Sequence, residues 1–372
     1  MTAQPDWHPT SGAGAGACDC CLGRAWLLSR LARHLDRARG QIARVLALSD
    51  EHLIAAVAGA QADLVRGELG RFDPDRARER ASVAGLGSIC RCDPRYPVSL
   101  RALESPPAAL HVAGGIDRFL RLVAERPVAI VGARRGSAYG LEVARSLGRG
   151  LGSAGLTVLS GMALGIDSAA HAGALSAGAP TVAVLPGGAD RPYPAAKRAL
   201  HEQIRCTGAA VSELAPGAPV WRWTFPARNR IIAALAAMTI VVEASDRSGA
   251  LLTAAFAQSL ERPVGAVPGR ITSPLSSGPH GLLAAGACLV RGPGDVLDQL
   301  FGVGIRRLPL DGRPAPAAEL RALLAAVAEG HDTAGALERA GFTPEHTLAA
   351  LASLELDGYI RREPGGRFSV VA

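Results

Sequence analysis

From residue 127 onwards, short apolar runs alternate with segments in which apolar residues recur at helical spacing. The runs are VAIVG, LTVLSG, TVAVLPG, AAVSEL, MTIVVEA, RPVGAVPG and ACLVRG. Strands that are apolar throughout are typical of a parallel sheet that is covered by helices on both faces. The pattern therefore predicts an α/β domain over residues 96–303, with an extended, Rossmann-like parallel sheet.

Two smaller units flank this predicted domain. Residues 22–95 contain short helical segments separated by glycine-containing breaks, which predicts a small helical domain of the SAM or helix-hairpin-helix kind. A proline-rich passage then leads into the sheet. A proline-rich linker at 304–316 is followed over 317–372 by three short helical segments and a Gly-Gly hairpin, the outline of a winged helix.

The net charge of +7 is concentrated in the middle of the chain, because residues 127–300 carry 15 basic and 10 acidic residues. This excess favours a polyanion as the partner of the central domain. The N-terminus has no charged start followed by an apolar core, and no apolar run reaches the roughly 18 residues of a membrane helix. We therefore expect a cytoplasmic protein that has no membrane contact.

The turn after the first of these strands, in VAIVGARRGSAYG, places glycines at Gly132, Gly136 and Gly140. This spacing is not the G-x-G-x-x-G of dinucleotide-binding folds, and a phosphate-binding loop ending in Gly-Lys-Ser/Thr is also missing from the sequence. We therefore predict no nucleotide cofactor. A strand, a small-residue turn and a helix N-terminus still suit an anion, which Arg134 or Arg135 could reach. This stretch alone is equally consistent with a tight strand-to-helix turn whose arginines are solvated.

Similar turns follow other strands, in SGMALGID, LPGGADRPYP, EASDRSGALLT and VPGRI. In an open parallel sheet these turns share the edge where ligands bind. The segment WRWTFPARNRIIAAL brings an aromatic ring and two arginines, Phe225, Arg228 and Arg230, to the same edge. Guanidinium groups beside an aromatic ring suit the backbone and bases of single-stranded nucleic acid. Pairing of these arginines with Glu213 or Glu243 is the alternative, and we favour phosphate binding.

These motifs, together with DPRYPVSLRALESPPAALHVAGG, FPARNRIIAAL and VPGRITSPLSSGPHGLLAAGA, resemble the DNA-processing protein A family (DprA, also called Smf) in order over residues 93–300. The resemblance implies a non-enzymatic protein that binds and protects incoming single-stranded DNA. It also implies a homodimer that displaces single-strand binding proteins and loads the recombinase RecA during natural transformation and recombination.

The resemblance also implies which residues bind DNA. They form the family's G-x-R turn, two serine-glycine turns, an Arg-Asn-Arg segment and a stacking aromatic residue: Gly132, Arg134, Ser160, Gly161, Phe225, Arg228, Asn229, Arg230, Ser248 and Gly249. Ala133 is a departure, because the family often has a hydroxyl residue there. The resemblance implies no catalytic residue.

Five cysteines near the N-terminal part, Cys18, Cys20, Cys21, Cys90 and Cys92, could hold a metal in principle. Their CxxC and CxC spacings are mixed and no CxxC pair recurs, so we expect reduced thiols without a metal. Asp167 and His171 have the i,i+4 spacing of two metal ligands on a helix. We interpret Asp167 instead as serving the helix N-terminus and His171 as making a local hydrogen bond.

The alternative function is enzymatic, because the fold and the PGG turn also resemble the LOG-type nucleotide phosphoribohydrolases. Those enzymes need a glutamate soon after the glycines, whereas here PGG continues into ADRPYP. A transcription regulator acting through its winged helix is less favoured, since residues 313–372 carry more acids than bases and duplex DNA attracts cations.

Overall fold

This computed structural model describes residues 16–305 and 316–370. The chain divides into two compact units, residues 1–308 and 309–372. Most of the predicted linker at 304–316 lies outside the described residues. Among the residues that are described, no helix is both long and apolar enough to cross a membrane.

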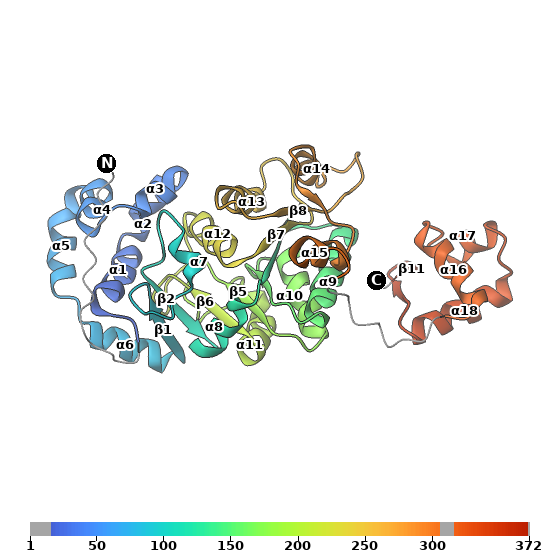
Figure 1. The fold of residues 1–372 in the computed structure, drawn as a ribbon, viewed down its shortest axis with the longest axis horizontal. Helices are drawn as coiled ribbons and strands as arrows, with labels where there is room; N and C mark the ends of the chain where they lie inside the picture. Colours follow the sequence, from blue (N-terminus) through green and yellow to red (C-terminus); the bar gives the residue numbers. More distant parts are fainter. Residues whose placement is uncertain (1–15, 306–315, 371–372) are drawn as a thin grey trace. The chain divides into compact units, whose positions relative to one another are not determined.

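The first unit is built on a nine-stranded sheet in the order β1-β2-β6-β5-β4-β3-β7-β8-β9 (Figure 1). Seven of its strands are those predicted from the apolar runs: β3 (Val128–Val131), β4 (Val158–Ser160), β5 (Thr181–Val184), β6 (Ala209–Ser212), β7 (Met238–Val241), β8 (Val264–Ala266) and β9 (Cys288–Leu289). Neighbours among these seven pair in parallel. The predicted parallel sheet is confirmed.

Two further strands lie at one edge of the sheet and are antiparallel. β1 (Leu86–Cys90) pairs with β2 (Ala109–Ala113), which in turn pairs with β6. The sequence pattern instead places the first segment in the helical domain and the second in the proline-rich passage. Gly87 and Ser88 interrupt the apolar pattern of β1, and two prolines end one residue before the start of β2, so neither segment has a clear strand signal.

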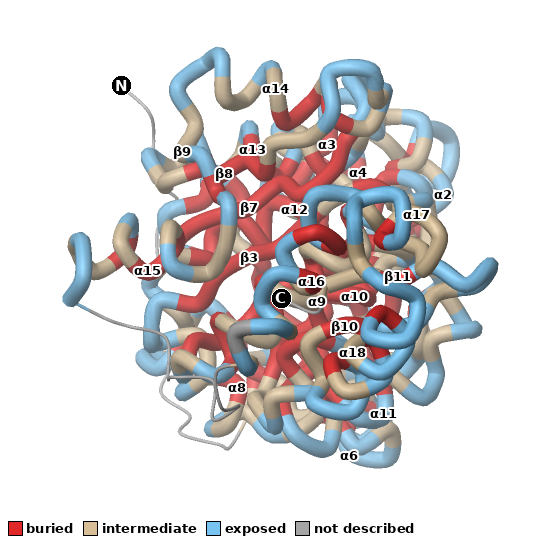
Figure 2. Tube along the Cα trace, turned by 90° about the vertical axis from the view of Figure 1, so that its right-hand side faces the viewer, coloured by how far each residue is buried: buried red, intermediate tan, exposed pale blue. Residues whose placement is uncertain are grey.

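Helices cover both faces of the sheet, and successive side chains of β3 therefore pack into different helix layers. Val128 and Ile130 pack with one layer, whereas Ala129 and Val131 pack with the other. The first layer contains α9 (Ala138–Ser153), α10 (Ile166–Ser176) and α15 (Pro293–Phe301), and the second contains α8 (Ile116–Ala124), α12 (Thr224–Leu235) and α13 (Gly249–Ser259). The remaining helices here are α7 (Val98–Arg101), α11 (Arg198–Thr207) and α14 (Ser277–Ala284). Strands β3, β7 and β8 are consequently buried along their length (Figure 2).

The N-terminal region is helical, as predicted, but it packs onto the sheet-bearing part within the same unit. Its helices are α1 (Asp19–Arg30), α2 (Ala32–Leu35), α3 (Ile42–Leu46), α4 (Asp50–Val57), α5 (Ala62–Gly70) and α6 (Pro74–Val83). Their core, around Leu27, Leu31 and Leu53, also includes Leu214 and Trp223 from the sheet-bearing part. The helical region therefore shares its core with the central domain.

The second unit has the predicted winged-helix outline. It consists of α16 (Ala318–Ala328), α17 (Ala334–Arg339), α18 (Pro344–Leu356) and the antiparallel strands β10 (Ile360–Glu363) and β11 (Arg367–Val370). Gly365 and Gly366 form the turn between the two strands with φ values of 84° and 73°, a conformation that glycine adopts at little cost. Leu337, Leu351 and Phe368 belong to its own hydrophobic core.

Buried histidines make the first unit sensitive to acid. Burial lowers the pKa of His171 to about 3 and that of His111 to about 4. In the unfolded chain a histidine has a pKa of about 6.5, so below this pH the unfolded state takes up protons that the folded state does not. Each of the two histidines should therefore destabilise the fold by about 1.4 kcal/mol for each pH unit below about 6.5, until its folded pKa is reached.

Urea unfolding of the full chain between about pH 7.5 and pH 5.5 measures this effect. We expect the midpoint to fall as the pH falls, with a smaller slope in His171→Gln and an unchanged slope in His52→Gln, since His52 is exposed. A midpoint that stays level over this range would contradict the prediction.

Candidate nucleic-acid interface

The connections of the sheet change direction at β3, because β4 lies on one side of it and β7 on the other. Ligands of open α/β sheets bind outside the carboxyl ends of the strands at such a point. The turns that follow β3, β4 and β7 meet here, and the first turns of α12 lie beside them. Together they enclose a pocket of ≈ 280 Å³.

Most of the residues predicted to bind DNA line this pocket. They are Gly132, Arg134, Phe225, Arg228, Asn229, Ser248 and Gly249. Ala163, Asp167 and Thr253 line it as well. We did not assign these three to the site. Ala163 has no reactive group to mark it, and Thr253 could have been found from its position one helical turn after Gly249 on α13.

Arg228 is the buried cation of the pocket, with an exposed fraction of 7%. Its Nη1 atom donates to the carbonyl oxygen of Val184 at 2.9 Å, while its Nε atom has no hydrogen-bond partner among the described residues. Burial lowers the pKa of Arg228 to about 10 and Asp167 opposes that change, so the guanidinium is charged at neutral pH. A buried charge with unused donor capacity favours an anionic ligand.

Gly161 makes room for this arginine. A Cβ atom at position 161 would lie 1.3 Å from Nη1 of Arg228, so any side chain there would displace the guanidinium. The backbone N–H of Gly161 donates to Oδ2 of Asp167 at 3.2 Å, and that of Ala163 donates to the same oxygen at 3.4 Å. The glycine of the predicted serine-glycine turn is therefore needed because its missing side chain leaves space for the Arg228 guanidinium.

Asp167 and His171 both make hydrogen bonds within the first unit. Asp167 lies in the first turn of α10 and accepts backbone hydrogen bonds from the preceding turn. Burial raises its pKa, while Arg228 and the backbone N–H groups act in the opposite direction. His171 Nδ1 lies 2.7 Å from Oγ1 of Thr181, deep in the core. His171 thus has the hydrogen bond that we expected, whereas Asp167 binds the turn before α10 and not the N–H groups of the helix itself.

Arg134 and Phe225 form a cationic and aromatic surface at the pocket. The Arg134 Cζ atom lies 4.5 Å from the centre of the Phe225 ring, and the Tyr193 ring centre lies 5.7 Å from it. Arg134 is exposed, whereas Phe225 is only partly so. A guanidinium group beside aromatic rings is an arrangement that suits the phosphates and bases of a single strand.

The N-terminus of α13 provides backbone donors on the opposite wall. The Ser248 side chain caps the helix by accepting from the N–H of Ala250 at 3.3 Å. Asn229 Nδ2 donates to the carbonyl oxygen of Gly249 at 3.1 Å and so ties α12 to this turn. A Cβ atom added at Gly249 would meet nothing within 4 Å, so the turn faces open space. The first N–H groups and the dipole of a helix stabilise an anion in this position.

Two predicted contacts are corrected by the structure. Nη2 of Arg230 donates to both carboxylate oxygens of Glu213, at 2.6 and 2.8 Å, and Arg230 is only 2% exposed. Ser160 is fully buried, and its Oγ donates to the carbonyl oxygen of Ile130 at 2.6 Å. Residues i and i+2 of a helix point about 200° apart, so Arg228 and Arg230 face opposite sides of α12.

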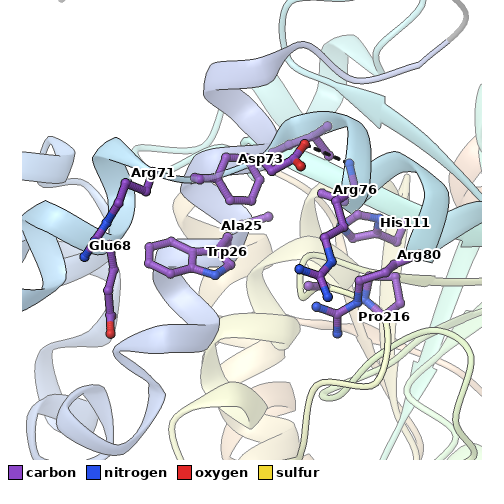
Figure 3. A pocket seen from close by; sticks show the side chains of 13 residues that line it. Ala25, Trp26, Glu68, Arg71, Asp73, Arg76, Arg80, His111 and Pro216 are labelled. Carbon is purple, nitrogen blue, oxygen red and sulfur yellow. Dashed lines mark hydrogen bonds between the residues drawn. The ribbon is translucent and has the colours of Figure 1, made fainter.

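A larger pocket of ≈ 500 Å³ lies elsewhere in the unit, between the helical region and the edge of the sheet. Arg76 and Arg80, one helical turn apart on α6, extend into it opposite Trp26 of α1 (Figure 3). His111 of β2 also contributes to its lining. None of the predicted DNA-binding residues lines this pocket.

Comparison with known proteins agrees with this arrangement. Residues 87–301 match the family described as DNA recombination-mediator protein A, and residues 311–366 match the DprA winged helix domain. A putative DNA processing protein DprA of Mycobacterium tuberculosis is 42% identical over 287 residues, which are 75% of this chain and 70% of that protein.

Two solved structures are similar over most of their own length. DprA of Streptococcus pneumoniae gives a TM-score of 0.61 at 32% identity, covering 76% of this chain and 96% of that one. DprA of Helicobacter pylori, described for its single-stranded DNA binding mode, gives 0.52 at 28% identity, covering 58% of this chain and 95% of that one. The chain belongs to the DNA recombination-mediator protein A family.

Proposed function

We propose that the pocket at the end of β3 binds the backbone of single-stranded DNA. The observation that carries the proposal is the buried guanidinium of Arg228, which has unused donor capacity beside the N-terminus of α13. Arg134 supplies a second, exposed cation next to Phe225. The single-stranded DNA binding described for the Helicobacter pylori relative supports this assignment. Because phosphates carry no base information, the sequence preference should be slight.

We infer further that the protein acts without catalysis. The carboxylate that lines the pocket, Asp167, is buried and accepts two backbone hydrogen bonds, so it is poorly placed to activate a substrate. The PGG turn that resembles a phosphoribohydrolase is filled by the protein itself. Cβ atoms at Gly187 and Gly188 would lie 3.0 and 2.7 Å from backbone atoms of Ala218 and Gly217. These glycines therefore serve packing, which weighs against the enzymatic alternative.

The biological role we propose is that of a recombination mediator in the cytoplasm. A homodimer presents two such pockets to incoming single-stranded DNA, displaces single-strand binding proteins and lets RecA assemble on the strand. The family of the chain supports this role. Release of a strand from its protective coat requires contacts that compete for the backbone, and the pocket offers such contacts.

Fluorescence anisotropy with labelled oligo-dT and a matched duplex, at several salt concentrations, tests the proposal. We expect tighter binding to the single strand and a binding constant that falls with salt. Arg134→Ala should weaken binding and reduce the slope of log K against log salt by about one, because one phosphate contact is lost.

Arg121→Ala is the matched control, since Arg121 is exposed on α8, which precedes the amino end of β3. It should bind like the wild type. Preference for the duplex, or binding that is equally weak for both DNAs, would refute the assignment of this pocket to single-stranded DNA.

A further inference from the structure

Four cysteines that lie far apart in the sequence bring their sulfur atoms together. Cys18, Cys21, Cys90 and Cys92 place their Sγ atoms within 4.8 Å of one another. The Sγ atoms of Cys21 and Cys92 are 3.7 Å apart, and those of Cys18 and Cys90 are 3.8 Å apart. All four cysteines are free and lie at buried or half-buried positions.

These distances fit one metal ion at the centre of the group. A zinc ion bound by thiolates has Zn–S bonds of about 2.3 Å, which puts the corners of the tetrahedron about 3.8 Å apart. The sulfur atoms of a disulfide would instead be about 2.05 Å apart. The separations of 3.7 and 3.8 Å match the edge of such a tetrahedron, and all four sulfur atoms lie within 4.8 Å of one another.

The local backbone holds the ligands in place. Cys18 caps α1 and Cys21 lies in its first turn, while Cys90 ends β1 and Cys92 follows in the next turn. The N–H of Cys18 donates to Sγ of Cys90 at 3.4 Å, a contact of the kind that stabilises a metal-bound thiolate. Leu22, Ala25 and Ala109 pack in the same cluster and shield the sulfurs from water.

We propose that these four cysteines bind a structural Zn²⁺ ion. The two ligand pairs have different spacings, and for that reason we expected reduced thiols without a metal from the sequence. The structure supplies the missing observation, because the CxxC pair at the start of α1 and the CxC pair at the end of β1 meet although 68 residues of the chain lie between them. With four protein ligands the ion has no open position, which is typical of structural zinc.

The ion would fasten the start of α1 to the edge strand of the sheet. α1 also supplies Leu22, Ala25 and Trp26 to the larger pocket (Figure 3), so the metal would help to hold that pocket in shape. This role is independent of the proposed DNA site, since no residue of the DNA-binding pocket belongs to the cysteine group.

Elemental analysis of the full-length protein, purified under reducing conditions without a histidine tag, tests the proposal. We expect about one zinc ion per chain in the wild type and less than about a fifth of that in Cys21→Ser and in Cys90→Ser, since three thiolates hold the ion poorly. Cys206→Ser is the matched control, because Cys206 is exposed on α11, and it should keep its zinc.

Cys20 provides a sharper control. Its exposed sulfur lies 3.5 Å from that of Cys18, yet it is outside the group of four. Cys20→Ser should therefore retain zinc, and loss of zinc there with retention in Cys92→Ser would overturn the assigned ligands.

Cobalt-substituted wild type gives a second measurement that does not depend on the folding of the variants. The visible absorption bands of tetrahedral cobalt with four thiolates are expected. A reduced wild-type protein that contains no zinc and takes up neither zinc nor cobalt would overturn the proposal, as would iron in place of zinc.

Discussion

Glu213→Ala should lower the free energy of unfolding of the first unit by about 3–5 kcal/mol, because it leaves a buried arginine without its counter-charge. Arg230 is 2% exposed, and its Nη2 atom makes both of its hydrogen bonds to the Glu213 carboxylate. Its Nε and Nη1 atoms have no partner among the described residues. Urea unfolding of the full chain, followed by circular dichroism, measures the loss.

The double variant Glu213→Leu/Arg230→Met distinguishes a lost ion pair from lost packing. It removes both charges and keeps apolar volume, so it should recover most of the stability that Glu213→Ala loses. Its affinity for oligo-dT should match that of the wild type, because neither residue lines the DNA-binding pocket. A single variant as stable as the wild type would contradict the prediction.

Gly161→Ala should weaken binding of oligo-dT by about 30-fold or more, as should Arg228→Ala, since a buried charge-assisted contact contributes about 2–3 kcal/mol. Gly161→Ala, unlike Arg228→Ala, keeps every charge of the protein. The added methyl group would lie 1.3 Å from Nη1 of Arg228, so the guanidinium has to leave its place and its hydrogen bond to Val184.

Gly294→Ala is the control for the glycine change. Its Cβ atom would meet nothing within 4 Å, so the methyl group should leave affinity unchanged and should not lower stability. Combining Gly161→Ala with Arg228→Ala should add little to either change alone, because both remove the same contact. Losses that add fully in the double variant would show that Gly161 acts on DNA by another route.

The parallel strands of the sheet could be predicted because each contains a short apolar run, and these runs alternate along the chain with segments of helical spacing. β1 could not, since its second and third residues, Gly87 and Ser88, are half-buried at the sheet edge and weaken the strand signal. β1 pairs with β2, and this pairing depends on the tertiary fold, so it cannot be predicted from the sequence of either segment alone.

The sequence predicted which arginines lie near the pocket, but not which of them lines it and which forms an ion pair in the core. Arg228 and Arg230 look alike in the sequence, and only their opposite directions on α12 separate a pocket-lining group from a core ion pair. That difference follows from helix geometry once the helix is placed. Cys21 lies close to Cys92 because α1 packs against the sheet. The spacing of the cysteines in the sequence does not predict this contact.

The depth of Arg228 limits which form of DNA could reach the proposed binding pocket. Duplex DNA has a persistence length of about 50 nm, and its phosphates lie on the outside of a stiff cylinder. A cation that is only 7% exposed lies below the reach of such a surface. A single strand can turn one phosphate inward at little elastic cost. The depth of the pocket would therefore favour flexible polyanions over rigid ones, and this selection would not depend on base sequence.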